Sequence, residues 1–227
     1  MVAALLFDVF GTCVDWRSAI TREVAQHVPD VDAVTFADAW RAAYHPAMAP
    51  IRDGTRPYIA LDELHRENLV ATLDAFGATC TTTDTLARAW ERLDPWPDTV
   101  SGLTALRRLY PIAPCSNGSI ALMTHLARHA GLPWDCILGA EIAGTYKPAP
   151  ATYLASCAAL RLAPPDVIFV AAHNDDLRAA RACGLATAFV PRVSEHGPDQ
   201  SKDLVAEEDW DIVARDLDDL ALRLGSA

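Results

Sequence analysis

Positive charge and long apolar runs are both scarce in this sequence of 227 residues. The formal net charge is −11, and Lys and Arg are not clustered into a basic stripe. We therefore expect no binding to nucleic acid or to an anionic membrane surface. No run of about eighteen apolar residues is present that could cross a bilayer. The N-terminus has no basic segment before its short apolar run, so no signal peptide is predicted and we expect a cytoplasmic protein.

Paired cysteines are also lacking. No CxxC pair occurs among the six cysteines, so buried free thiols are expected, and neither disulfides nor a zinc site is predicted. Cys13 and Cys115 adjoin the motifs described below and could be considered as nucleophiles. Neither has a neighbouring histidine in the sequence that could activate it.

Hydrophobic residues, in contrast, make up 51% of the chain, which is enough for a sizeable core. Residues 2–8 form a continuous apolar run, as expected of a strand buried on both faces. After residue 98 strand and helix patterns alternate, with strands expected at 112–116, 136–140, 167–172 and 187–191. This alternation predicts an α/β fold with a doubly wound, Rossmann-like parallel sheet.

Between the first strand and this alternating region the pattern is helical. Helices are expected around 18–28, 33–48, 59–76 and 83–93, and the prolines at 95 and 97 end the segment. The sequence therefore predicts an all-helical cap domain at 15–96, inserted into a catalytic core made of 1–14 and 97–227.

The first strand ends at a candidate nucleophile. Asp8 follows its apolar residues, and Gly11-Thr12 come shortly after. A carboxylate can displace a leaving group and form an ester, which divides a difficult hydrolysis into two steps. Gly11 permits a tight turn and Thr12 can donate a hydrogen bond. Taken alone, an aspartate in such a place is more typical of a turn or a helix cap than of a nucleophile.

Polar residues follow the later strands as well. Ser116-Asn117 offer hydroxyl and amide donors beside a helix N-terminus, which is a natural place for an anion. Lys147 precedes a proline and is therefore extended or in a turn; near Asp8, its ammonium would keep that carboxylate ionised. Asp176 could pair with Lys147. Carboxyl ends of parallel strands meet at one sheet edge, so these groups are expected to converge.

The order and spacing of these motifs resemble the haloacid dehalogenase superfamily. Most of its members are magnesium-dependent phosphatases with a second aspartate two residues after the nucleophile, where this chain has Phe10. At the position where those phosphatases carry a further metal-binding acid, this chain has Ala172. Magnesium seeks oxygen ligands, so both replacements argue against a metal. The whole chain looks most like the L-2-haloacid dehalogenases, type II.

That resemblance implies a reaction and a set of site residues. Asp8 would attack the halogen-bearing carbon of a short 2-haloacid, such as an L-2-haloacid or a haloacetate, with inversion, and water would hydrolyse the resulting ester to a 2-hydroxy acid. The partners implied are the haloacid and water; no cofactor or metal takes part, and a homodimer is expected. The Trp40-Arg41 pair matches the family's halide-binding motif, so Arg41 and Asn117 would hold the departing halide. The other residues expected at the site are Val9, Phe10, Thr12, Ser116, Lys147, Tyr153 and Asp176.

The fourth motif departs from the family pattern. Ala171 and His173 stand where family members carry a serine and an asparagine. Asn174 could supply the missing amide, and His173 could activate the hydrolytic water because its reference pKa lies near neutrality. His173 could equally do no more than cap the next helix.

Two alternative functions stay open at this point: a magnesium-dependent phosphatase or phosphonatase of the same superfamily, and a non-catalytic binding protein that kept the fold.

Overall fold

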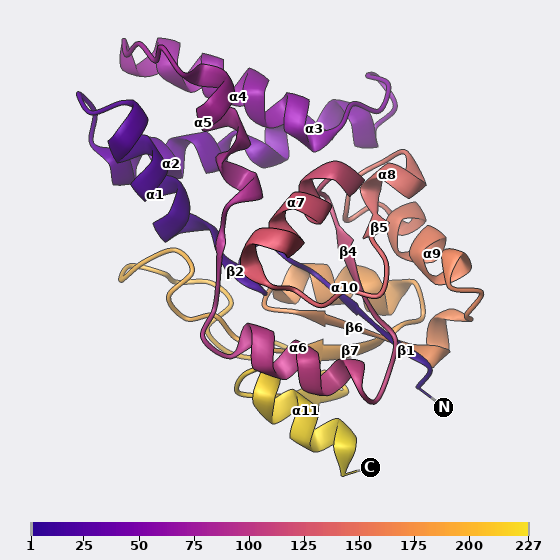
Figure 1. Cartoon of the computed structure of the whole chain (residues 1–227). Coiled ribbons are helices and arrows are strands. Elements are labelled where there is room, and N and C mark those ends of the chain that lie inside the picture. The colour runs from indigo at the N-terminus through magenta and orange to yellow at the C-terminus, as the bar shows by residue number, and fades with distance from the viewer. Residues whose placement is uncertain (1, 227) are drawn as a thin grey trace.

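The computed structural model describes residues 2–226 and contains a parallel sheet flanked by helices, beside which a group of helices stands apart (Figure 1). The strand order is β5-β4-β1-β6-β7-β8, and every neighbouring pair is parallel. The predicted doubly wound α/β fold is confirmed. The strands are β1 Ala4–Phe7, β4 Ile112–Ser116, β5 Leu138–Gly139, β6 Val167–Ala171, β7 Ala186–Phe189 and β8 Ile212–Val213.

β1 lies in the middle of the sheet, and all of its side chains are fully buried, which is why its sequence is a continuous apolar run. Leu5 lies opposite Ile112 of β4 and Ile168 of β6. The backbone N–H of Asp8 donates to the carbonyl of Val170 at 3.0 Å. The first polar residue after the strand is thereby held at the carboxyl edge of the sheet.

The helices of the alternating region cover the sheet (Figure 1). Within residues 2–226 no helix is both long enough and apolar enough to cross a membrane. α6 and α11 pack against each other at one side of the sheet (Figure 1). β8 is additional to the strands expected from the sequence. The helical elements are α6 Thr99–Arg107, α7 Ile120–Ala130, α8 Ala140–Ala143, α9 Pro150–Ala159, η2 Pro164–Asp166, α10 Asn174–Ala182 and α11 Leu217–Gly225.

The helical segment leaves and rejoins the core at one place. Its two ends, β2 (Val14–Asp15) and β3 (Asp94–Pro95), form a short antiparallel pair, and the Trp96 indole donates to the Gly11 carbonyl at 2.8 Å. Helical structure was predicted for this segment, and its division from the core as a separate cap domain stays a prediction. Its elements are α1 Trp16–His27, α2 Ala33–Ala42, α3 Tyr44–Arg52, α4 Leu61–Phe76, α5 Thr83–Ala87 and η1 Arg88–Glu91.

One predicted helix in this segment is in fact two. The pattern over 33–48 indicated a continuous helix, but α2 ends at Ala42 and α3 begins at Tyr44. In a continuous helix the ring of Pro46 would clash with the carbonyl of Ala42, whereas proline is tolerated in a first helical turn. The break turns the chain just after Arg41.

Candidate active site

Asp8 is held through both carboxylate oxygens. Lys147 Nζ donates to Oδ1 at 2.8 Å, and Thr12 Oγ1 donates to Oδ2 at 2.7 Å. His173 Nδ1 lies 3.2 Å from the same Oδ2. The Asp8 side chain is almost completely buried, so its position is set by these three groups and not by solvent.

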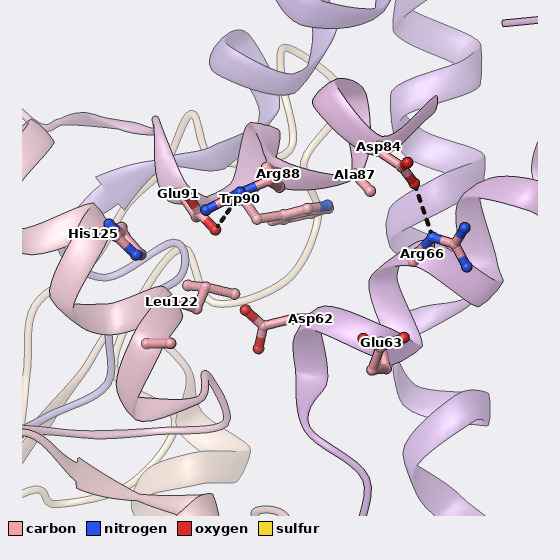
Figure 2. A pocket seen from close by; sticks show the side chains of 11 residues that line it. Asp62, Glu63, Arg66, Asp84, Ala87, Arg88, Trp90, Glu91, Leu122 and His125 are labelled. Atoms are coloured by element: carbon pink, nitrogen blue, oxygen red, sulfur yellow. Dashed lines mark hydrogen bonds and ion pairs between the residues drawn. The ribbon is translucent and has the colours of Figure 1, made fainter. Parts of the chain in front are cut away.

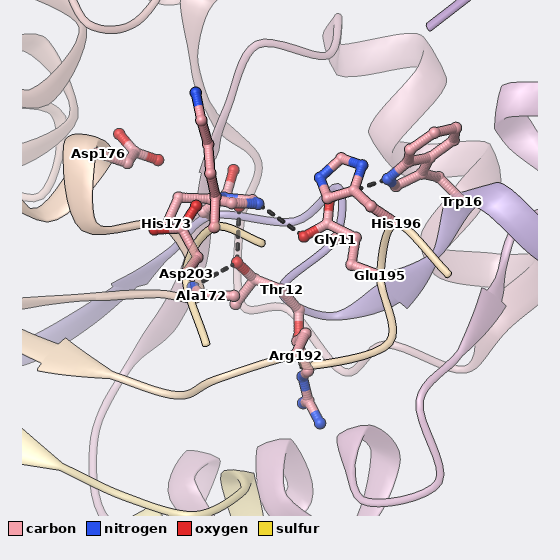
Figure 3. Close-up of polar contacts among 12 residues, drawn as sticks. Gly11, Thr12, Trp16, Ala172, His173, Asp176, Arg192, Glu195, His196 and Asp203 are labelled. Carbon is pink, nitrogen blue, oxygen red and sulfur yellow. Dashed lines mark hydrogen bonds and ion pairs between the residues drawn. The ribbon is translucent and has the colours of Figure 1, made fainter. Parts of the chain in front are cut away.

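The turn after β1 places these partners. Thr12 Oγ1 also accepts a hydrogen bond from the Ala172 backbone N–H at 2.9 Å, which ties the turn to the end of β6 (Figure 3). Gly11 has φ +85°, and a Cβ there would lie 2.1 Å from Glu195 Oε1. Glycine is therefore required both by the backbone conformation and by the close approach of Glu195.

Lys147 links Asp8 to a second carboxylate. Its Nζ donates to Asp176 Oδ2 at 2.5 Å, and the Tyr153 hydroxyl donates to Asp176 Oδ1. The Lys147 backbone N–H donates to Asn117 Oδ1 at 2.7 Å, so the segment bearing the lysine is anchored to the end of β4. The structure thus brings together Asp8, Lys147, Asp176, Tyr153 and Asn117 from four separate motifs.

The charges of this group are interdependent. Burial opposes ionisation of Asp8, but Lys147 and His173 outweigh burial and hold the pKa of Asp8 well below its usual range. Burial likewise opposes the charged form of Lys147, yet Asp176 and Asp8 raise its pKa. Burial and the nearby Asp8 raise the pKa of Asp176, although Lys147 lowers it. Asp8 is therefore ionised at neutral pH beside a charged lysine.

His173 has a second partner that the sequence did not indicate. Its Nε2 lies 2.8 Å from Glu195 Oε2, and the Trp16 indole donates to Glu195 Oε1 at 2.9 Å (Figure 3). Burial opposes protonation of His173, but Glu195 and Asp8 raise its pKa well above 6.5. Glu195 follows β7 in a segment without periodicity or a motif, so no sequence pattern could have identified it.

A cavity of about 750 Å³ opens beside Asp8, and two arginines, Arg41 and Arg52, are among its lining residues. The Arg41 guanidinium lies 4.0 Å from the Tyr44 ring centre, and within residues 2–226 Nη1 of both arginines is buried without a hydrogen-bond partner. Arg52 was not predicted. Buried guanidinium N–H groups without partners suit an incoming anion. The other lining residues are Asp8, Phe10, Trp16, Asp38, Ala42, His45, Asn117, Lys147, Pro148, His173, Asp175, Asp176, Glu195, His196 and Asp203.

Five predicted site residues do not line this cavity. Two of them, Thr12 and Tyr153, contact the Asp8 and Asp176 carboxylates from behind it. Val9 is fully buried, and its carbonyl accepts from the Cys13 N–H. Ser116 is also fully buried, and its hydroxyl accepts from the Gly118 N–H at 3.1 Å. Both residues support the backbone around the site. The fifth is Asn174.

The amide of Asn174 faces the chain between residues 203 and 210. Its Nδ2 donates to Asp203 Oδ1 at 2.9 Å and to the Val205 carbonyl at 3.1 Å. Its Oδ1 accepts from the Glu207 N–H at 3.0 Å and from the Trp210 indole at 2.9 Å. Because the Asn174 amide makes all of these bonds, it anchors the segment 203–210. It does not take the place in the cavity of the asparagine that family members carry at position 173.

We accordingly expect Asn174→Ala to affect stability more than turnover. The substitution leaves the buried Trp210 indole and the Glu207 N–H without their acceptor, at a cost of about 1–3 kcal/mol for each unsatisfied group. Urea unfolding should show this loss, while the rate of the catalysed reaction per folded molecule changes less than about tenfold. A normal unfolding curve with a greatly reduced rate would instead indicate a direct role of the amide in the reaction.

Thiol and metal chemistry fit the site poorly. Cys13 and Cys115 are fully buried, and burial raises the pKa of Cys115 to about 12 and that of Cys13 further. Over residues 2–226, no group of three or more His, Cys, Asp or Glu side chains is arranged to hold a metal ion. Phe10 lines the cavity, and Ala172 is buried at the end of β6, in the two positions where a metal-binding acid would be needed.

A second cavity, of about 310 Å³, lies between η1, the start of α4 and α7 (Figure 2). Its arginines are already paired: Arg66 contacts Asp84 and Arg88 contacts Glu91, each at 3.1 Å. It shares no lining residue with the cavity beside Asp8. The larger cavity, with its unpaired arginines, is therefore the candidate active site.

The chain is similar to a known protein family and to several solved structures. A sequence model of haloacid dehalogenase-like hydrolases matches residues 2–184. Among solved structures, the defluorinating L-2-haloacid dehalogenase Rha0230 is 50% identical, with a TM-score of 0.96 over 99% of this chain and 95% of that chain. The L-2-haloacid dehalogenase PA0810 is 48% identical, with a TM-score of 0.95 over 99% and 100% of the two chains. An L-2-haloacid dehalogenase from Xanthobacter autotrophicus is 25% identical, with a TM-score of 0.84 over 100% and 99%. A comparison with curated protein sequences gave no match.

Proposed function

Because this chain belongs to the haloacid dehalogenase-like hydrolase family, we propose that it hydrolyses the carbon–halogen bond of short 2-haloacids, giving 2-hydroxy acids through an ester on Asp8 and without a metal. The observation that carries the proposal is the Asp8 carboxylate, 2.8 Å from the Lys147 ammonium, beside a cavity with an unpaired Arg41 guanidinium. Displacement of a halide requires two groups: an ionised nucleophile and a hydrogen-bond donor that can bind the departing anion. Two relatives near 50% identity are L-2-haloacid dehalogenases, which supports this substrate class.

In the first step an Asp8 oxygen forms a bond to C2 of the haloacid while the carbon–halogen bond breaks, and the halide leaves with the bonding electrons. Lys147 and Thr12 hold the carboxylate in place, so little reorganisation is needed on attack. Negative charge moves from Asp8 to the halide. Arg41 and Asn117, which both line the cavity, stabilise the charge that develops there.

In the second step water attacks the carbonyl carbon of the Asp8 ester, and the hydroxy acid leaves. Lys147 is suited to stabilise the negative oxygen of the tetrahedral intermediate, because its Nζ already contacts Asp8 Oδ1. Inversion at C2 occurs only in the first step, since the second breaks the bond between the ester oxygen and the Asp8 carbonyl carbon. An L substrate would therefore give a D product.

Metal independence is supported by the surroundings of Asp8. Both of its oxygens already have cationic or hydroxyl partners, and the side chains of Phe10 and Ala172 carry no oxygen that could bind a metal. The magnesium-dependent phosphatase remains the alternative, but no observation favours it. Family resemblance also supports a helical cap domain, a homodimer and a cytoplasmic location as further parts of the proposal.

The proposal is tested by incubating the purified protein with L-2-chloropropionate or with p-nitrophenyl phosphate, each with magnesium or with a chelator. We expect chloride release that the chelator does not reduce, and no release of nitrophenol. Magnesium-dependent nitrophenol release without chloride would support the phosphatase instead. Release of neither product, by a folded protein and over a panel of haloacids, would favour a binding protein.

We expect Arg41→Lys to reduce chloride release by about 10²- to 10³-fold, the range seen when one donor to a developing anion is lost. Lysine keeps the charge but cannot reproduce the planar guanidinium that packs over the Tyr44 ring. The measurement is the steady-state rate of chloride release. Arg56→Lys, at an exposed pair with Glu67, is the matched control and should change the rate little; equal rates for both variants would contradict the role of Arg41.

A further inference from the structure

His173 and Glu195 form a buried pair at the edge of the site that the displacement step does not require. The two imidazole nitrogens face different carboxylates: Nδ1 lies 3.2 Å from Asp8 Oδ2, and Nε2 lies 2.8 Å from Glu195 Oε2. Glu195 is 1% exposed. A buried glutamate beside a histidine that contacts the nucleophile calls for a chemical explanation, since burying a charge is costly.

Glu195 is itself held firmly. The Trp16 indole donates to its Oε1, and the absence of a side chain at Gly11 leaves the space that the carboxylate occupies. When the imidazole is neutral, this arrangement selects one tautomer. The Nε2–H donates to Glu195, so the unprotonated Nδ1 faces Asp8.

We propose that His173 is the base that activates water for hydrolysis of the ester on Asp8, and that Glu195 is the positioning residue that orients it and keeps it basic. This inference rests on the proposed function, because it assigns residues to the second step of that reaction. It follows the general arrangement of a base oriented by a buried carboxylate.

The protons balance over the cycle. In the resting enzyme the imidazolium lies between the Asp8 and Glu195 carboxylates. Formation of the ester removes the negative charge on Asp8, so His173 loses one of its two anionic partners and releases its proton to solvent. This proton balances the charge of the departed halide ion. Neutral Nδ1 then takes a proton from water as the water oxygen bonds to the Asp8 carbonyl carbon.

Collapse of the tetrahedral intermediate restores the resting state. The bond from the Asp8 carbonyl carbon to the substrate oxygen breaks, and the leaving alkoxide takes the proton from His173. The newly formed carboxylic acid of Asp8 then gives its proton back to Nδ1. One haloacid and one water have become one hydroxy acid, one halide ion and one proton.

Asp176 is less suited to this task. Both of its oxygens are already engaged, one by Lys147 and the other by the Tyr153 hydroxyl. Its side chain is also less exposed than that of His173, at 13% against 23%. His173 lines the cavity and can meet a water there.

The charged surroundings of His173 come from several elements. Asp8 follows β1, and Lys147 lies beyond Asp8 in the segment before α9. On the Glu195 side His196 Nε2 lies 3.6 Å from Glu195 Oε1. Burial raises the pKa of Glu195, but His173, His196 and Arg41 together lower it. After ester formation Asp8 is neutral, and Glu195 is the carboxylate that still contacts the imidazole.

The test uses rapid mixing of the full-length enzyme with excess L-2-chloropropionate, with chloride and intact protein mass measured over time. For Glu195→Gln we expect about one chloride per active site at a rate close to that of the wild type, followed by steady turnover at least about tenfold slower. Protein carrying the mass of one dehalogenated substrate should accumulate. Glu67→Gln, at the exposed pair with Arg56, is the matched control and should behave as wild type.

The pH profile separates this role from a structural one. Without the negative charge of Glu195, the pKa of the imidazole in the ester state falls, so the second step should reach half of its maximal rate at lower pH, with a lower plateau. His173→Ala, a second variant that has no titrating base and no amide at this position, should accumulate the ester and lose this pH dependence.

Two results would overturn the inference: equal slowing of both phases in Glu195→Gln without ester accumulation, or ester that accumulates in Asp176→Asn but not in His173→Ala. No chloride from the wild type would contradict the proposed function itself.

Discussion

Asp8→Asn should abolish halide release, with a loss of about 10⁴-fold or more, because a neutral amide cannot take the place of the carboxylate as nucleophile. The fold should survive. Lys147 keeps Asp176 as a partner and His173 keeps Glu195, so neither cation is left buried without a carboxylate. The measurements are steady-state chloride release, thermal unfolding and intact protein mass, which should show no ester.

The matched control for Asp8→Asn is Asp84→Asn. It removes the same charge from an exposed pair with Arg66 and should leave the rate nearly unchanged. If Asp8→Asn retained more than about one hundredth of the wild-type rate, Asp8 would not be the nucleophile.

Lys147→Met should both stop catalysis and destabilise the protein. Removing the ammonium leaves the Asp8 and Asp176 carboxylates buried without their shared cation, and breaking a buried pair in this way costs about 3–5 kcal/mol. Chloride release should fall by at least about 10²-fold, since the nucleophile loses the cation that contacts its Oδ1 and contributes to its position and ionisation. Urea unfolding at pH 7 measures the loss of stability.

The destabilisation by Lys147→Met should shrink as the pH falls from 7 to 5. Without the lysine, burial raises the pKa of Asp176 above the unfolded value of about 4, while Asp8 keeps His173 as a partner. The folded variant then binds more protons than its unfolded state, so its stability rises on acidification. In the wild type Asp8 has a lowered pKa and contributes the opposite trend, a loss of stability as the pH falls. A difference between the two proteins that does not depend on pH would contradict this account.

Much of the fold could be predicted because its signals are local. The apolar run before Asp8 indicated a strand buried on both faces, and the alternation after residue 98 indicated a parallel sheet. In such a sheet the strand ends share one edge, so the convergence of Asp8, Lys147 and Asp176 followed from topology. The break between α2 and α3 was missed because the helical pattern continues through Pro46.

The details of the site depended on side-chain direction. Asn174 and His173 are neighbours in the chain, and the sequence offered both as candidates for the same role. Because α10 begins at Asn174, the two side chains diverge: His173 lies in the cavity, and the Asn174 amide is used up by the segment 203–210. Spacing along a chain does not determine which of two adjacent residues faces a ligand.

The sequence by itself determined the chemistry available at the sheet edge: an aspartate after a buried strand, a lysine and a second aspartate on later motifs, and no acid at Phe10 or Ala172. Only the tertiary structure decided that Glu195 contacts His173, and that Arg41 and Arg52 both line the cavity. The physical reason is that local patterns report burial and backbone conformation, whereas contacts between distant segments depend on packing. Glu195 approaches the site because Gly11 leaves room for it, a relation between two residues that no pattern around either one contains.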